Sequence, residues 1–199
     1  ADDVSLGFVY IEDGTLNITS DGDGISAAAI AQIQSGNFNI VSAGGAENAA
    51  QKQNTDDFFR GADRMAAASY SESTDTVSCK GIKSDTGIVI NGGNFIIDSA
   101  DDALHSNGNI ELNGGKFNIS TGDDALHADN NVTVNSAEID IAESYEGIEG
   151  LTIDINGGDI SVVSSDDGLN AAGGNDGSGF GGGMQAMETD SDAYIRITG

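Results

Sequence analysis

The pentapeptide Asp-Asp-Ala-Leu-His occurs twice in the 199-residue chain, beginning at Asp101 and at Asp123, so the same acids and the same histidine repeat after 22 residues. Stacked copies would place like charges about 5 Å apart, where they repel by about 1 kcal/mol in water and about 3 kcal/mol at an effective dielectric near 20. Either the carboxyl pKa values rise or a cation binds. Oxygen ligands in flexible turns suit Ca²⁺ better than zinc or copper.

Acidic residues recur at the corresponding positions of neighbouring copies. The segment ESYEGIEG, residues 143–150, adds three glutamates beside them, and we expect the best Ca²⁺ site there, next to Asp124 and Asp167. The alternative is that Asp-Asp and Asp-Gly pairs only form turns whose side chains face water. The predicted Ca²⁺ ligands are Asp101, Asp102, Asp123, Asp124, Glu143, Glu146, Glu149, Asp166 and Asp167.

A second polar series follows three residues after the second acid of each copy and is expected to point outward. Its members are Lys83, His105, His127, Glu149 and Asn170. Such a strip offers polar groups at a spacing suited to a sugar chain, whereas stacked histidines also serve a structural role by bonding an Asp of the next copy. The predicted carbohydrate-binding residues are Lys83, His105, His127, Tyr145 and Asn170.

Apolar residues with period two surround these acids, and each copy of about 22 residues holds three short alternating segments. Such strands bury their apolar sides only if the copies stack coaxially, which predicts an all-β, right-handed parallel β-helix of about six rungs plus the start of a seventh. A β-sandwich is the rival fold, but it gives no reason for a strict 22-residue repeat. The expected interior columns are Val9, Ala31, Ile88, Ile110, Val132, Ile153; Leu16, Phe38, Phe95, Phe117, Ile139, Ile160; and Ile25, Ile82, Leu104, Leu126, Ile148, Leu169.

We interpret residues 1–199 as one domain with two irregular insertions, at about 43–79 and 173–190. The copy that ends at Leu169 is one residue shorter at the Gly150 turn. Residues 192–199 resemble the opening of a seventh copy, which predicts that further rungs or another chain cover the open end.

Charge and composition restrict the partners. Thirty-three acids against seven Lys and Arg give a formal net charge of -26, which disfavours nucleic acid and anionic membranes and favours cations. We expect no direct membrane insertion, because no stretch of about 20 apolar residues occurs. Cys79 is the sole cysteine, so an intramolecular disulfide is excluded.

The segments INGGNF, SADDALHS, STGDDALHAD, ESYEGIEG and SDDGLNAAGGND together resemble the bacterial carbohydrate-binding β-helix family with a pectate-lyase-like fold. The resemblance extends over nearly the whole chain from Gly7. It implies an extracellular, cell-surface protein that contains calcium and binds cellulose and acidic sugars such as polygalacturonate without cleaving them. It also implies that the acids in the matching motifs, the Ca²⁺ ligands predicted above, belong to the family's acidic positions.

Three functions follow as hypotheses. In the first, the protein is a non-catalytic module and Ca²⁺ bridges its carboxylates to those of an acidic plant cell-wall glycan. In the second, it is a calcium-dependent pectate lyase with Lys80 or Lys83 as the base. In the third, it is a structural surface rod that calcium stiffens. Cellulose binding is harder to explain, since Trp is absent and the candidate stacking rings are Phe58, Phe59, Tyr70, Tyr145 and Phe180.

Overall fold

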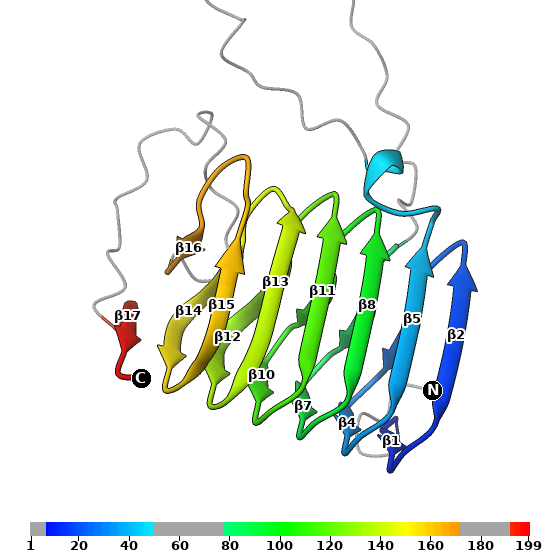
Figure 1. Cartoon of the computed structure of the whole chain (residues 1–199), viewed down its shortest axis with the longest axis horizontal. Helices are drawn as coiled ribbons and strands as arrows, with labels where there is room; N and C mark the ends of the chain where they lie inside the picture. Colours follow the sequence, from blue (N-terminus) through cyan, green and yellow to red (C-terminus); the bar gives the residue numbers. More distant parts are fainter. Residues whose placement is uncertain (1–6, 50–77, 172–191) are drawn as a thin grey trace, which may run out of the picture.

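The described part of the chain forms a parallel β-helix of about six turns with almost no α- or 3-10 helix, as the repeat predicts (Figure 1). The computed structural model describes residues 7–49, 78–171 and 192–199. Each turn contributes strands to three faces, and all pairing between turns is parallel. No helix among the described residues is long and apolar enough to cross a membrane.

The strands of the first and third faces join into one 11-stranded sheet, because two long strands pass the corner between these faces without a break. The first face holds β1 (Val9–Ile11), β4 (Ile30–Ile33), β7 (Gly87–Ile90), β10 (Asn109–Leu112) and β17 (Tyr194–Ile197). The third face holds β3 (Ile25–Ala27), β6 (Ile82–Ser84), β9 (Leu104–Ser106) and β16 (Leu169–Asn170). The long strands are β12 (Leu126–Val134) and β14 (Ile148–Ile155).

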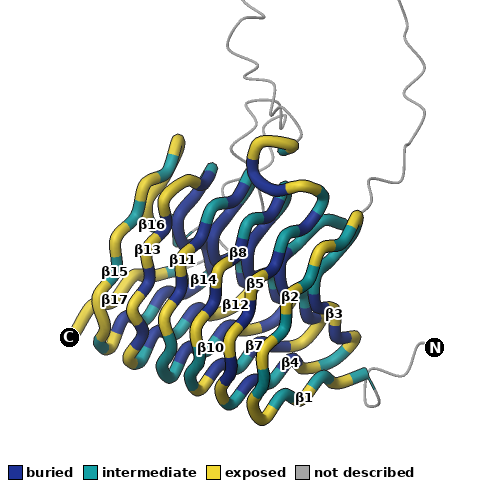
Figure 2. The backbone as a smooth tube through the Cα atoms, turned by 45° about the vertical axis from the view of Figure 1, so that its right-hand side comes forward, coloured by how far each residue is buried: buried dark blue, intermediate teal, exposed yellow. Residues whose placement is uncertain are grey.

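The second face is a separate six-stranded sheet whose strands run side by side across Figure 1. Its residues alternate between buried and exposed, as a strand with one covered side requires (Figure 2). Its strands are β2 (Thr15–Ser20), β5 (Asn37–Ser42), β8 (Asn94–Ser99), β11 (Lys116–Thr121), β13 (Ala137–Glu143) and β15 (Gly158–Val162).

The three predicted interior columns are confirmed by the strand registers. In the second column, Phe38 pairs with Phe95 and Phe95 with Phe117. Their rings stack with centroids 4.6 and 4.7 Å apart. The first and third columns pair in the same order, for example Ile110 with Val132 and Leu104 with Leu126. Because successive coils lie one strand spacing apart, each interior residue packs on its counterpart in the next coil.

The turn between the first and second faces carries an amide ladder that the sequence interpretation missed. Asn113 Nδ2 donates to Asn91 Oδ1 at 2.9 Å, and Asn135 Nδ2 donates to Asn113 Oδ1 at 2.7 Å. Gln34 and Asn156 extend the series at its two ends. The signal was present in the sequence, because the first Asn of each NGG turn recurs with the same period as the strands.

The irregular features fall where the repeat breaks. Ile82 pairs with both Ile25 and Leu104, which confirms that the second coil closes only after the long insertion. The register shift between Ala128 and Asn131 confirms the shorter turn at Gly150. Residues 43–49 include the short 3-10 helix η1 (Ala46–Asn48), whereas 50–77 and the second insertion, 173–190, lie outside the described residues. β17 pairs with β14, so residues 194–197 do continue the first face.

Candidate functional site

One polar corner of the β-helix, just before the third face, collects most of the predicted site residues. Backbone hydrogen bonds align one residue from each coil there: Gly81 N donates to Asp102 O at 2.9 Å, and Ala103 N donates to Asp124 O at 2.9 Å. We call this series the acidic column, and its members are Asp23, Lys80, Asp102, Asp124, Glu146 and Asp167. The predicted alignment of these acids is confirmed, but the lysine within their column was missed.

The carboxylates of this column connect successive coils directly. The Oδ1 atom of Asp23 accepts a hydrogen bond from Lys80 N at 3.0 Å, and Asp102 Oδ1 accepts one from Asp124 N at 3.1 Å. Asp124 Oδ1 accepts in the same way from Glu146 N at 3.2 Å. These acids therefore have a structural role in addition to any ligand they bind.

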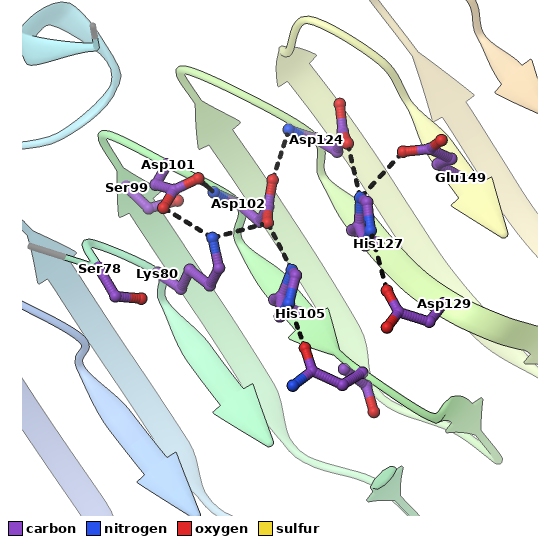
Figure 3. A network of polar contacts seen from close by, with 12 residues as sticks. Ser78, Lys80, Ser99, Asp101, Asp102, His105, Asp124, His127, Asp129 and Glu149 are labelled. Carbon is purple, nitrogen blue, oxygen red and sulfur yellow. Dashed lines mark hydrogen bonds and ion pairs between the residues drawn. The ribbon is translucent and has the colours of Figure 1, made fainter. Parts of the chain in front are cut away.

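Lys80 neutralises the first acidic pair (Figure 3). Its Nζ lies 2.7 Å from Asp101 Oδ2 and 3.0 Å from Asp102 Oδ2. Burial alone would raise the pKa of Asp102, but the hydrogen bond from His105 and the charge of Lys80 lower it to about 2. Burial alone would lower the pKa of Lys80, and attraction to Asp102 and Asp101 raises it instead. The lysine is thus held as a cation.

The two histidines lie beside this column as a stacked pair. His105 and His127 are register partners on β9 and β12, with ring centroids 4.8 Å apart. His105 Nδ1 lies 2.7 Å from Asp102 Oδ2, within the same coil. The suggested bond to an Asp of the next coil is therefore not what His105 forms.

His127 sits between two carboxylates from successive coils (Figure 3). Its Nδ1 lies 3.0 Å from Asp124 Oδ2 and 2.9 Å from Glu149 Oε2. Burial would lower the pKa of His127, but hydrogen bonds to Asp124 and Glu149 raise it to about 11. Burial raises the pKa of Asp124 to about 8, whereas the hydrogen bond from His127 lowers that of Glu149. The His127 imidazolium is therefore shared by two carboxyl groups. Of these two groups, Asp124 has the higher pKa and so holds its own proton more readily than Glu149 does.

The structure brings together only some of the predicted Ca²⁺ ligands. Among the described residues, Asp101, Asp102 and Asp123 form the one group of three carboxylates whose oxygens all lie within 4.8 Å of one another. Two further groups contain histidine: Asp102 with His105 and His127, and Asp124 with His127 and Glu149.

The glutamates of ESYEGIEG separate into different surroundings. Glu149 is 2% exposed against His127, and Glu146 is 2% exposed with both carboxylate oxygens accepting from Asn170 Nδ2 at 2.9–3.0 Å. Burial raises the pKa of Glu146. Glu143 lines a different, open cavity, and Asp166 and Asp167 are exposed in the last complete turn. The three glutamates therefore form no single carboxylate group in the part of the chain that the structure describes.

The predicted carbohydrate-binding residues do not form one continuous exposed strip. Lys83, His105, His127 and Asn170 do share a column with Glu149. Glu149 lies in register with His127 on the outer side of the strand, but its side chain is buried against His127, and the His127 side chain is itself only 12% exposed. Tyr145 lies away from this column, in the wall of the cavity that Glu143 lines.

The fold and this corner define a parallel β-helix with stacked polar columns. A family model described as "Carbohydrate-binding domain-containing protein" matches residues 1–125, more than half of the chain. The chain belongs to this carbohydrate-binding domain family, whose name describes binding and no catalysis. Comparisons with curated proteins and with solved structures found no match.

Proposed function

We propose that this protein is a non-catalytic module that binds an acidic plant cell-wall polysaccharide, such as polygalacturonate, through Ca²⁺ held at the polar corner. The observation that carries the proposal is the convergence of Asp101, Asp102 and Asp123 from adjacent coils, with carboxylate oxygens within 4.8 Å of one another. Family membership supports carbohydrate binding in general. The acidic glycan as ligand and Ca²⁺ as the bridging ion are part of the proposal.

The donor chemistry of this triad fits a hard cation. All three ligands are carboxylates, and Ca²⁺ takes six to eight oxygen ligands in flexible geometry. Each oxygen of Asp101 and Asp102 already has a neighbour in Lys80, in His105 or in a backbone N–H group, yet a carboxylate oxygen has two lone pairs. Ca²⁺ must therefore compete with the ammonium of Lys80, which sets the affinity of the site.

The net charge gives the cation a role in recognition. A protein of formal charge -26 repels a uronate polymer, and the repulsion extends over about 8 Å at physiological ionic strength. Ca²⁺ bound by the triad keeps part of its coordination shell for ligands other than protein, and sugar carboxylates can fill it. We place this function outside the bacterial cell, at its surface, where both Ca²⁺ and plant polysaccharide are met.

Cellulose and lyase activity have weaker support. Among the described residues, the exposed aromatic rings are Phe8 and Tyr10 on the first coil and Tyr194 on the last, so they do not combine into a flat stacking platform. Phe58, Phe59, Tyr70 and Phe180 lie outside the described residues. Lys80 is a poor base, because two carboxylates raise its pKa and keep it protonated.

Affinity electrophoresis in gels that contain polygalacturonate tests the proposal. We expect the protein to be retarded with Ca²⁺ and not with EGTA. The Asp123→Asn variant should lose most of the retardation, whereas Asp140→Asn, the same change on the exposed second face, should behave as wild type. Retardation that EGTA leaves unchanged would refute the calcium bridge, and folded protein that Ca²⁺ does not retard would refute binding to this glycan.

A further inference from the structure

A short arm of the chain, residues 43–49, crosses the ends of neighbouring coils on the side where the second face ends. It leaves the second coil after β5 and carries η1, which Figure 1 shows above the strand ends. Ala46 N donates to Asp98 Oδ1 of the third coil at 2.8 Å. Ala49 then packs on Gly122 of the fourth coil so closely that a Cβ at position 122 would lie 2.2 Å from Ala49 Cβ. The arm is therefore fixed to the coils that it crosses.

An open cavity of about 450 Å³ lies between this arm and the turns that follow β11, β13 and β15. Small-molecule sites have volumes of ~300–1,000 Å³, so the size is sufficient for a ligand. The arm contributes Glu47 and Ala49, the turn after β13 contributes Tyr145, and the turn after β15 contributes Val163. None of the three carboxylates of the proposed Ca²⁺ site lines it.

A β-bulge helps to place Glu143 in this cavity. The pairing of β11 with β13 is regular up to Ile119 and Ile141, and then Ser120 pairs with Glu143 in place of Ala142. Bulges of this kind redirect side chains and are common beside functional sites. In the part of the chain that the structure describes, the side chains of Glu47 and Glu143 make no hydrogen bond or ion pair, so both carboxylates can accept from a ligand.

The chemistry of the lining selects a class of ligand. The carboxylates of Glu47 and Glu143 and the hydroxyl of Ser165 suit a polyhydroxyl compound, and Lys, Arg and His are absent from the described lining residues. The hydroxyls of Thr121 and Ser144 already donate to the carbonyl oxygens of Asp101 and Val163. An anionic sugar would meet two like charges with no counterion. The Tyr145 ring and the Val163 and Ala49 side chains supply apolar surface for the C–H face of a sugar ring.

We propose that this cavity binds a neutral saccharide unit, independently of Ca²⁺ and at a site separate from the acidic triad. The inference rests on the carbohydrate-binding function of the family but not on the calcium bridge. It gives the protein two sugar sites of opposite preference, one for uronate with Ca²⁺ and one for uncharged sugar without it.

Isothermal titration in EGTA tests this inference with matched probes. The ligands are fully methyl-esterified trigalacturonide, the unesterified trigalacturonate, and two neutral trisaccharides, a β-1,4-glucan and a xylan fragment. We expect at least one neutral probe to bind and the unesterified trigalacturonate not to bind. Glu47→Gln and Glu143→Gln should each weaken that binding at least fivefold, because each loses a charged acceptor. Glu12→Gln, the same change at an exposed turn of the first coil, should have no effect.

The outcomes separate this inference from the calcium bridge. Failure of every neutral probe to bind, or neutral binding that neither cavity variant weakens, would overturn the saccharide cavity. Polygalacturonate retardation with Ca²⁺ should survive in Glu143→Gln, and its loss there would also overturn the separation of the two sites. A matching thermal midpoint for the variants and wild type confirms that the fold is retained.

Discussion

The two halves of the polar corner neutralise buried carboxylates with different cations. In the earlier coils, Lys80 serves Asp101 and Asp102, and its charge persists well above neutral pH. In the later coils, His127 serves Asp124 and Glu149, and its charge depends on those neighbours. A buried lysine and a buried histidine thus both neutralise neighbouring carboxylates. Only in the histidine half, however, are the pKa values of a histidine and of a carboxyl group raised above neutral pH. An aligned column of acids is therefore stable when Lys or His side chains of the same chain lie beside the carboxylates and neutralise them.

The largest expected effect is the loss of the charge on Asp102, which serves both a lysine and a histidine. Asp102→Asn keeps the shape but leaves the ammonium of Lys80 and the ring of His105 with one carboxylate contact fewer each. Breaking a buried ion pair costs about 3 kcal/mol, so the free energy of unfolding in urea should fall by about that amount. Asp140→Asn, on the exposed second face, is the control. If both variants changed the free energy of unfolding by the same small amount, the ion pairs of Asp102 would not stabilise the fold.

A smaller effect concerns the pH dependence of the histidine half. The folded-state pKa of His127, about 11, lies above its ordinary value of about 6.5. Its stabilising contribution is therefore complete below pH about 6.5 and is lost as the pH rises toward 11. The raised pKa of Asp124, about 8, acts in the same direction. Measured in EGTA, the free energy of unfolding should fall continuously as the pH rises from 7 to 10.

The histidine variants sharpen this test. His127→Gln should flatten the decline between pH 7 and 10, because it removes the shared imidazolium. His105→Gln is the matched comparison, since His105 contacts one carboxylate where His127 has three within 4.0 Å. An equal effect of the two substitutions, or stability that increases over this range, would show that His127 is not the shared cation.

The sequence predicts those features that repeat and misses those that break the repeat. The interior columns follow from period-two strands at a 22-residue spacing, because only stacking buries Phe38, Phe95 and Phe117 together. Lys80 in the acidic column was also predictable, since it precedes Ile82 by two residues as Asp102 precedes Leu104. The register itself was predicted, since Ile82 was placed in one column with Leu104, but the lysine was not recognised as the counterpart of Asp102.

Other features of the site depend on contacts that no repeat encodes. The burial of Glu149 follows from its contact with His127, and periodicity alone only places it on the outer side of a strand. The cavity forms because the arm from the second coil reaches Gly122 two coils further on. Its lining comes from an irregular arm and a bulged strand, so neither its volume nor its residues follow from the spacing of the copies.

Calcium titration of the wild type and three variants tests whether Asp101, Asp102 and Asp123 bind Ca²⁺ in competition with Lys80. By isothermal titration, wild type should bind Ca²⁺, Asp123→Asn should bind at least tenfold more weakly, and Lys80→Gln should bind more tightly because it releases Asp101 and Asp102 from the ammonium. Lys116→Gln removes the same charge from an exposed ion pair with Glu138 and should match wild type. We expect Lys80→Gln to bind Ca²⁺ most tightly, wild type and Lys116→Gln equally and less tightly, and Asp123→Asn most weakly. Absence of Ca²⁺ binding, or affinities that Lys80→Gln and Asp123→Asn leave unchanged, would show that these carboxylates are not the site.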